Sequence, residues 1–418
     1  MSPAAGGNAP QAQTWVESLR VTGFRTYEQL SLNLSGAPVV VLGLNGAGKT
    51  NLLEAVSLLA PGQGLRRASY PDMIGRAQLS EQPTPSLPGT DGWAIFSKLH
   101  GPGGPVEIGT GLTAEQAARK AGRSVRIDRK PAKGSGALAE HCEMVWLVPA
   151  MDGLFTGPSA DRRRFLDRLV LCAEPAFRTA ASGYERAMRQ RNRLLANAAE
   201  GRGTDPRQFE ALEDQLSVAG ASVVRARHET LTALREAITT RTAHAPRSPF
   251  AWATLELRGE IDDWWREGDG NPDALVDRLR SHFASTRRRD IAAGRTLVGP
   301  HRSDLQVEHG PKSMPAAQCS TGEQKALLVN LVLAHAALVK SKRNGAAPIL
   351  LLDEIAAHFD QTRRAALFGD LETLGTQAWM TGTDPHAFAP LATGAQFIRV
   401  IDGTAVHADF AEVSAQAE

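Results

Sequence analysis

One stretch of the sequence decides the fold: Gly43-Leu44-Asn45-Gly46-Ala47-Gly48-Lys49-Thr50. It matches the pattern G-x-x-x-x-G-K-[ST], whose glycines allow successive backbone N–H groups to surround phosphate oxygens. A β-branched run at 39–42 precedes it, and a helix-forming run with one apolar face follows at 51–59. A buried strand, a glycine loop and a helix form the context that this motif requires. The sequence therefore predicts a phosphate-binding loop.

Each polar position of this loop has an expected role toward a bound nucleotide. The start of the following helix adds unpaired N–H groups and a partial positive charge. We expect Lys49 to reach the β- and γ-phosphates and Thr50 to offer its hydroxyl to Mg²⁺. Nucleotide contacts are expected from Gly43 through Asn51. ATP and Mg²⁺ are therefore the expected cofactors.

Composition restricts the class of protein without choosing a partner. The chain has 418 residues, 42% of them hydrophobic and 22% charged, which is typical of a globular protein with a substantial core. A formal net charge of +2 argues neither for nor against nucleic acid. Three cysteines without C-x-x-C spacing favour free thiols in a reducing cytosol. No apolar run reaches the length of a membrane helix, so a cytoplasmic protein is expected.

The order of predicted elements indicates an α/β fold with an inserted helical arm. Strands alternate with helices in the C-terminal part, which predicts a mostly parallel central sheet. Runs at 93–99, 106–112 and 125–128 predict antiparallel strands, and 144–148 predicts another strand. From 159 the pattern becomes helical, and the apolar spacing in a helix from about 206 to 242 predicts two antiparallel helices packed along a seam. That helix would be about 55 Å long.

These changes in the predicted secondary structure divide the chain into four expected segments. Residues 1–14 form a disordered leader, and 15–154 form the N-terminal part of the head with the phosphate loop. Residues 155–295 form the inserted helical arm lobe. Residues 296–418 form the C-terminal part of the head.

A second half of the nucleotide site is predicted where Ile349–Leu352 is followed by Asp353 and Glu354. Ligands of parallel sheets bind at the C-terminal ends of the strands. Asp353 is placed there to hold Mg²⁺ opposite Thr50, and Glu354 to orient or deprotonate an attacking water. The alternative is that the two acids only end a core strand.

A third motif narrows the class of ATPase. The run Ser320-Thr321-Gly322-Glu323-Gln324 precedes a helix and resembles the S-x-G-x-Q signature of ABC-type ATPases. That resemblance implies an ABC-type head in which the signature acts on the ATP of a second copy, so that ATP drives homodimerisation. It also implies that Asp360 is the aspartate of the D-loop, the segment that follows the two acids. Thr381 or Thr383 then senses the γ-phosphate from the switch segment.

Further runs resemble the RecF family, bacterial recombination mediators related to SMC heads. They lie at 19–27, 48–55, 154–167 and 296–304. The chain departs from the family pattern at Ser303, where an acid is common, at Cys319, and at 356–360. The resemblance implies slow, DNA-stimulated ATP hydrolysis, and binding to duplex and gapped DNA at single-strand junctions with little sequence specificity. It also implies loading of RecA together with RecR and RecO, on the bacterial nucleoid.

Clusters of arginine in the arm are compatible with contacts to DNA phosphates. Arginines outnumber acids between 161 and 193, and 287–289 is a run of three arginines. The alternative for each is a solvated, ion-paired helix face. The candidates for DNA contact are Arg163, Arg186, Arg189, Arg193, Arg287 and Arg288.

Three other functions remain open from the sequence. A transporter's nucleotide-binding subunit would carry a much shorter insert between Thr50 and Ser320. An SMC-like structural clamp would need a longer coiled coil than the predicted arm. A small-molecule kinase would need no signature motif.

Overall fold

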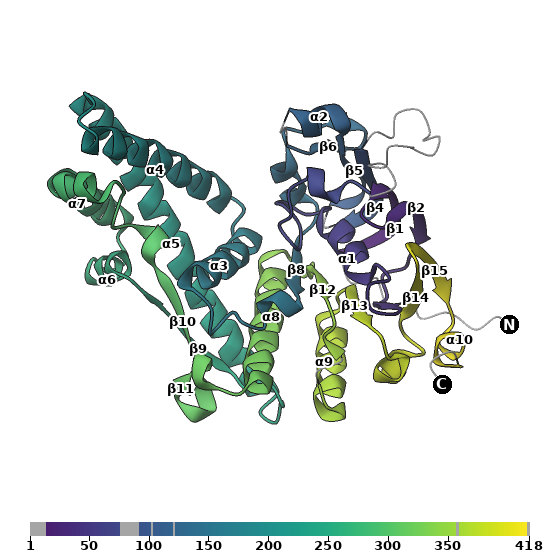
Figure 1. Cartoon of the computed structure of the whole chain (residues 1–418). Helices are drawn as coiled ribbons and strands as arrows, with labels where there is room; N and C mark the ends of the chain where they lie inside the picture. The colour runs from purple at the N-terminus through teal and green to yellow at the C-terminus, as the bar shows by residue number, and fades with distance from the viewer. Residues whose placement is uncertain (1–13, 76–91, 102, 120–121, 357–358, 416–418) are drawn as a thin grey trace. The chain divides into compact units, whose positions relative to one another are not determined.

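The computed structural model describes residues 14–75, 92–101, 103–119, 122–356 and 359–415 (Figure 1). The chain divides into two compact units. The head unit comprises 1–152, 247–250 and 332–418, and the arm unit comprises 153–246 and 251–331. Residues 1–13 of the expected leader lie outside the described residues, and so does most of the proline-rich segment before residue 92.

The boundary between the units differs from the expected one on its C-terminal side. The chain enters the arm unit at Gly153, close to the expected 155, but returns to the head unit at Val332 instead of 296. The intervening segment contains strand β10 (Asp304–His309), which pairs with β9 (Ala253–Arg258) and β11 (Met314–Pro315). Helix α3 (Ser159–Ala173) packs on β10 and helix α5 (Pro206–His244) on β9, so this small sheet belongs to the arm unit.

The head unit is built on a six-stranded sheet in the order β15-β14-β3-β13-β12-β8. All neighbours are parallel except the β14–β15 hairpin, which confirms the predicted α/β class. Every residue of β3 and of β12 is buried, as expected for strands covered on both faces. The hairpin strand β15 and helix α10 were not expected from the sequence. The strands are β3 (Val39–Leu42), β8 (Met144–Leu147), β12 (Ile349–Leu352), β13 (Ala378–Gly382), β14 (Gln396–Ile401) and β15 (Thr404–Ala408).

A second sheet of the head unit is antiparallel, in the order β2-β1-β4-β5-β6-β7. Its strands alternate buried and exposed side chains, because one face covers the core and the other meets solvent. The strands are β1 (Trp15–Phe24), β2 (Tyr27–Asn33), β4 (Gly92–Gly101), β5 (Gly104–Thr113), β6 (Ser124–Ile127) and β7 (Lys130–Pro131).

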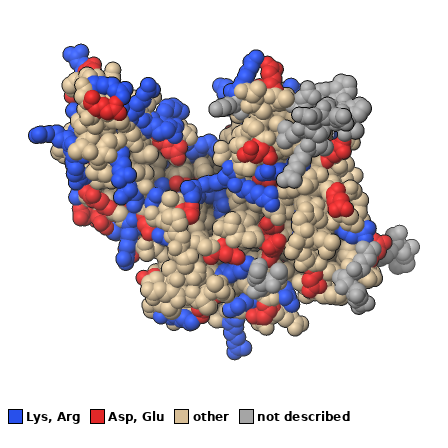
Figure 2. Space-filling model, viewed as in Figure 1, with Lys and Arg blue, Asp and Glu red and all other residues tan. Residues whose placement is uncertain are grey.

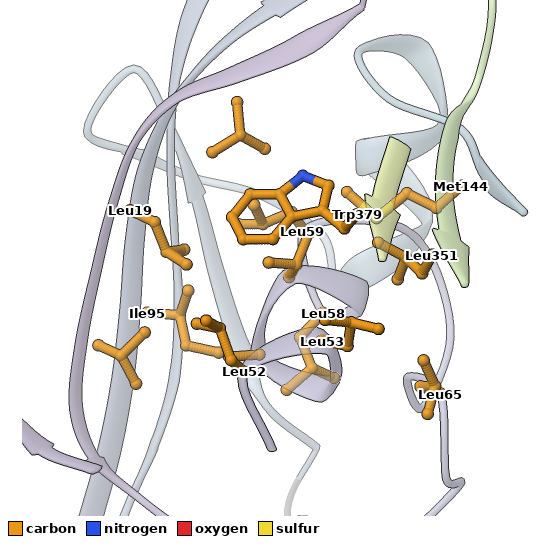
Figure 3. Packing of buried hydrophobic residues seen from close by; sticks show 14 of the residues in the cluster. Leu19, Leu52, Leu53, Leu58, Leu59, Leu65, Ile95, Met144, Leu351 and Trp379 are labelled. Atoms are coloured by element: carbon orange, nitrogen blue, oxygen red, sulfur yellow. The ribbon is translucent and has the colours of Figure 1, made fainter. Parts of the chain in front are cut away.

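Helix α1 (Lys49–Ser57) joins these two sheets into one core. In Figure 3, Leu52 of α1 lies beside Ile95 of the antiparallel sheet, and Leu351 of the parallel sheet lies on the other side of the helix; Leu19, Leu53 and Trp379 belong to the same buried cluster. All of these side chains are at most 1% exposed. Burying each leucine contributes about 1.5–3 kcal/mol, so the helix that follows the phosphate loop is held firmly. The other helices of the head unit are α2 (Ala114–Ala118), α9 (Gln361–Leu374) and α10 (Phe410–Ala415).

The arm unit is mainly helical, as predicted. Its longest helix, α5 (Pro206–His244), lies along α4 (Phe177–Ala199) and α7 (Pro272–Ala293) (Figure 1). Asp205 caps α5 by accepting a hydrogen bond from the Arg207 N–H at 2.9 Å. Helices α3 (Ser159–Ala173) and α6 (Glu260–Glu267) complete the unit. Helix α8 (Thr321–Lys342) begins in the arm unit and continues into the head unit from Val332 on.

A buried ion network joins the three long helices of the arm unit. The Arg191 side chain is fully buried and donates to Asp290 at 2.7 Å and to Glu213 at 3.0 Å. Its guanidinium also donates to the Thr296 hydroxyl at 2.9 Å and lies 5.1 Å from the Phe283 ring centre. One side chain on α4 thereby holds α5, α7 and the segment after α7 in register.

Candidate functional site

The phosphate loop lies between the C-terminal end of β3 and the start of α1, and its glycines are required by geometry. Gly46 and Gly48 have φ angles of 84° and 117°, which side chains other than glycine rarely adopt. A Cβ on Gly43 would lie 2.4 Å from the carbonyl oxygen of Val400. Glycine at these positions is therefore required for the loop conformation that phosphate binding uses.

Lys49 crosses this loop from the first turn of α1. It is 5% exposed, and its Nζ donates to the carbonyl oxygens of Gly43 at 2.8 Å and Leu44 at 2.9 Å. Burial lowers the pKa of Lys49, and the nearby carboxylates of Glu354 and Asp353 oppose that shift. The ammonium group is therefore held at the mouth of the loop where phosphates would bind.

Thr50 meets the second half of the site. Its Oγ1 donates to Oδ1 of Asp353 at 3.1 Å, which brings the end of β12 against the start of α1. Hydroxyl and carboxylate oxygens are ligands that Mg²⁺ accepts together with nucleotide phosphates. Among the described residues no group of three or more His, Cys, Asp or Glu could hold a metal ion. The donor set thus fits a cation completed by phosphate and water, and not one enclosed by protein.

Glu354 follows Asp353 and has a backbone conformation that is uncommon for its residue type. Its φ is 53°, in the left-handed region. Its N–H donates to Oγ1 of Thr381 at 2.8 Å, and the same hydroxyl donates to Oδ1 of Asp353 at 2.7 Å. Thr381 is fully buried at the end of β13, whereas Thr383 is exposed. The sequence offers Thr381 and Thr383 equally as the γ-phosphate sensor, whereas the structure distinguishes them by burial.

The turn between β1 and β2 contacts the phosphate loop. Residue spacing in the sequence does not reveal this contact. The Tyr27 hydroxyl donates to the Gly48 carbonyl at 3.0 Å, and Tyr27 is fully buried. Asn51 donates to Thr26 Oγ1 at 3.1 Å and accepts from Arg66 at 2.7 Å. A Cβ on Gly48 would lie 2.8 Å from Thr26 Oγ1, so the turn and the loop are in direct contact.

Glu54 is a second feature of α1 that sequence reasoning missed. Its carboxylate is fully buried and accepts two hydrogen bonds from Arg25, at 2.9 and 3.0 Å. Arg66 lies 3.6 Å from the same carboxylate. Two parallel guanidinium bonds fix the orientation of the helix as well as neutralising a buried charge. The acid inside an apolar helix was the signal available in the sequence.

The signature segment lies at the N-terminus of α8 in the arm unit, with Ser320, Thr321 and Gly322 exposed. Ser320 donates to the Glu323 carboxylate through its N–H at 3.0 Å and through its hydroxyl at 2.9 Å. Lys312 pairs with the same carboxylate, and this contact, followed by those of Ser320, lowers the pKa of Glu323 to about 2. Gln324 is buried and donates to the Cys319 carbonyl at 2.8 Å. Ser320 and Gly322 therefore face solvent at a helix start.

Asp360 has a local structural role in the described chain. It caps α9 by accepting a hydrogen bond from the Arg363 N–H at 2.8 Å. Ala357 and His358 of the expected D-loop lie outside the described residues. The assignment of Asp360 to that loop stays a prediction.

The six candidate DNA-binding arginines fall into two groups. Arg186, Arg189 and Arg193 on α4 and Arg288 on α7 are exposed, and Arg189 lies 3.6 Å from Glu185. Figure 2 shows basic side chains over the surface of the arm unit, at the left of the view, interleaved with acidic ones.

The other two arginines are held by the protein itself. Arg163 donates to the Ser303 carbonyl at 2.8 Å, and burial lowers its pKa. Arg287 pairs with Glu213 at 2.6 Å and lies 5.2 Å from the Phe209 ring centre. A guanidinium with its donors already engaged is less open to a phosphate than those on α4. Contact with DNA stays a prediction for all six.

Comparisons with known proteins agree on one family. The model of the RecF/RecN/SMC N-terminal domain matches residues 15–389. A protein of Mesorhizobium japonicum named "DNA replication and repair protein RecF" is 49% identical over 94% of this chain and 98% of its own. A protein of the same name from Rhizobium etli is 50% identical over 92% of this chain and 96% of its own.

Two solved structures share the fold. The recombination mediator protein RecF with ATPrS matches with a TM-score of 0.79 at 19% identity, over 95% of this chain and 99% of its own. The Smc head domain of Pyrococcus furiosus bound to the C-terminal domain of ScpA has a TM-score of 0.52 at 15% identity, over 97% of this chain and 99% of its own. In the described part of the chain, no helix combines the length and apolar character needed to cross a membrane.

Proposed function

This chain belongs to the RecF family of ABC-type ATPases, within the wider RecF/RecN/SMC N-terminal domain family, and we propose that it binds DNA and acts in recombinational repair and replication restart. In this proposal, ATP and Mg²⁺ close two copies on gapped DNA, slow hydrolysis releases them, and the closed form assists the loading of RecA. RecR and RecO are the protein partners that family membership implies. The site of action is the cytoplasm, at the nucleoid.

The observation that carries the ATPase part is the convergence of the ends of β3 and β12 at the phosphate loop. Lys49, Thr50, Asp353 and Glu354 come from segments about 300 residues apart and meet in one place, through the Thr50–Asp353 hydrogen bond. The open N–H groups of the loop and Lys49 would bind the β- and γ-phosphates. Thr50 and Asp353 would hold Mg²⁺, which neutralises charge on the phosphates when bound. Glu354 would orient and deprotonate water.

The exposed signature supports dimerisation. Ser320, Thr321 and Gly322 are exposed at the start of a 22-residue helix, where the Ser320 hydroxyl and N–H donate to the Glu323 carboxylate. A helix start of this kind attracts anions. In the proposed dimer, this segment completes the ATP site of the other copy, so nucleotide holds the two chains together.

The exposed arginines of the arm support binding to the DNA backbone. Contacts to phosphates position a protein without reading sequence, and they are sensitive to salt. Because phosphate contacts carry no sequence information, duplex and gapped DNA of any sequence are the proposed substrates.

The rival functions are less well supported. A long SMC-like coiled coil is not compatible with α5, whose 39 residues would extend about 58 Å. A transporter subunit would not need the arm unit, which occupies 153–246 and 251–331.

The test combines sedimentation with ATPase measurements. ATP and Mg²⁺ should convert the monomer to a dimer, and Lys49→Ala should abolish the conversion. Lys98→Ala is the matched control, because Lys98 lies on the antiparallel sheet and pairs with Glu17. ATPase rates with and without gapped duplex across a salt series then test the DNA part. A monomer at saturating ATP would exclude the composite site, and no DNA binding at low salt would exclude the role in repair.

A further inference from the structure

We propose that Thr381 is the positioning residue of the ATPase site, using one buried hydroxyl to set both the Mg²⁺ ligand Asp353 and the backbone of Glu354. This inference rests on the proposed ATPase function and goes beyond it by assigning Thr381 a role other than γ-phosphate sensing.

The fold places Thr381 beside the two acids. β13 runs parallel to β12, with Leu352 opposite Met380, so the next residue on each strand is Asp353 and Thr381. Asp353 follows the last residue of β12, Thr381 is the second-last residue of β13, and Thr381 is fully buried.

The direction of each hydrogen bond is determined. A backbone N–H can only donate, so Thr381 Oγ1 accepts from Glu354 at 2.8 Å. The hydroxyl hydrogen is then given to Oδ1 of Asp353 at 2.7 Å, because an ionised carboxylate only accepts. The result is a chain from the Glu354 peptide through Thr381 to Asp353.

These two hydrogen bonds determine which oxygen of Asp353 remains available to a ligand. Oδ1 accepts from Thr381 and from Thr50 at 3.1 Å. Among the described residues, Oδ2 accepts no hydrogen bond from the protein. The carboxylate is therefore turned so that Oδ2 is the oxygen available to a cation.

The hydrogen bond between Thr381 and Glu354 also supports the backbone conformation of Glu354. A φ of 53° is unfavourable for a residue with a Cβ and persists only where surrounding contacts hold it. The hydrogen bond from its N–H to Thr381 is such a contact. We infer that this bond keeps the Glu354 side chain directed toward the phosphate loop.

Sensing of the γ-phosphate does not fit Thr381. Its hydrogen is already donated to Asp353, so a phosphate oxygen would have to displace a carboxylate. Thr383 is exposed on the loop that follows β13 and is the better candidate for that contact.

The experiment compares four variants with the unmodified chain. Thr381→Val removes the hydroxyl at nearly constant volume, and Thr381→Ser restores it. Thr376→Val is the matched control, because Thr376 is buried just before β13 and its hydroxyl bonds the Pro348 carbonyl at the opposite end of the strands. Thr383→Val tests the exposed threonine. Calorimetry with ATPγS at varied Mg²⁺ measures metal-dependent binding, and steady-state kinetics measures kcat and KM for ATP.

Thr381→Val is expected to lose most of the Mg²⁺-dependent gain in ATPγS affinity, with binding in EDTA unchanged. Its kcat should fall roughly ten- to hundredfold, the range for hydrogen bonds to charged groups, and Thr381→Ser should recover most of it. Thr376→Val should change neither quantity even if it lowers the melting temperature.

Unchanged Mg²⁺ dependence in Thr381→Val overturns the inference, and so does a serine variant as impaired as the valine variant. If Thr381→Val loses the Mg²⁺-dependent gain in ATPγS affinity but the unmodified chain never hydrolyses ATP, the proposed turnover fails and the positioning role stands. If it shows no Mg²⁺-dependent binding, both fail.

Discussion

Thr50 Oγ1 lies 3.1 Å from Oδ1 of Asp353, although 303 residues separate them in the chain. The contact joins the first turn of α1 to the end of β12, and all of the arm unit lies between them in sequence. The long insertion therefore leaves the two halves of the nucleotide site in direct contact.

Glu354→Gln should stop turnover while keeping ATP binding. The amide preserves the size of the side chain but cannot accept a proton from water, and loss of a general base costs about a hundredfold or more in kcat. Sedimentation should show a dimer that persists after ATP addition, whereas the unmodified chain returns to monomer. Hydrolysis at the normal rate would assign the base to another residue.

A mixture of two inactive variants should recover activity if each site is built from two chains. Lys49→Ala removes the phosphate contact, and Ser320→Arg blocks the signature. A mixed dimer holds one intact site of two, so up to about half of the normal rate is expected in an equal mixture. Each variant alone is the control. No recovery in the mixture would place signature and phosphate loop in the same chain's site.

Replacing Arg186, Arg189 and Arg193 together with Gln should weaken DNA binding and flatten its salt dependence. Each lost phosphate contact lowers the slope of log K against log salt by about 0.9, so a change of up to about 2.7 is expected. Arg278→Gln and Arg280→Gln are controls, because both arginines already pair with acids on the arm unit. An unchanged slope would assign the α4 arginines to a solvated surface.

Arg191→Met should destabilise the arm unit by about 3–5 kcal/mol, because it leaves the carboxylates of Glu213 and Asp290 buried with a partner missing. Arg189→Met, at an exposed position of the same helix, should change the free energy of unfolding by less than about 0.5 kcal/mol. Urea unfolding measures both. Equal effects would show that the network is not a stabilising core.

His301 should make the arm unit less stable in acid. Both of its ring nitrogens are engaged, Nδ1 with the Tyr184 hydroxyl at 2.7 Å and Nε2 with the Thr296 carbonyl at 3.2 Å, which suits the neutral ring. Burial lowers the pKa of His301 to about 4. Between about pH 6.5 and pH 4 the unfolded chain binds a proton that the folded chain does not. Stability should therefore fall by up to about 3 kcal/mol as pH decreases through that window.

His301→Gln provides the comparison for this pH effect. Glutamine can accept from Tyr184 and donate to Thr296 without titrating. Urea midpoints of this variant should change less between pH 7 and pH 4.5 than those of the unmodified chain. Parallel pH profiles for the two proteins would show that His301 is not the responsible group.

The local chemistry of the nucleotide site could be predicted without coordinates. Glycines at fixed spacing before Lys49 and Thr50, and acids after an apolar strand, depend only on backbone conformation and on strand ends, which short-range patterns encode. The α/β class, the parallel central strands and the helical arm followed from the same periodicities. The hairpin strand β15 and helices α6 and α10 were not predicted, because such short elements contain too few repeats of the apolar pattern of a strand or of a helix.

Contacts between distant segments were decided only by the tertiary structure. These contacts depend on which strands become neighbours, and residue spacing within one segment does not record that. They are the contacts of Tyr27 with Gly48, of Arg25 with Glu54, and of Thr381 with Asp353 and Glu354. The same reason separates Arg287, engaged by Glu213, from the exposed Arg186 and Arg193 of α4. The sequence by itself determined which atoms can hold a nucleotide. Sheet order and side-chain packing decided how those atoms are oriented, because hydrogen-bond geometry exists only after the strands are placed.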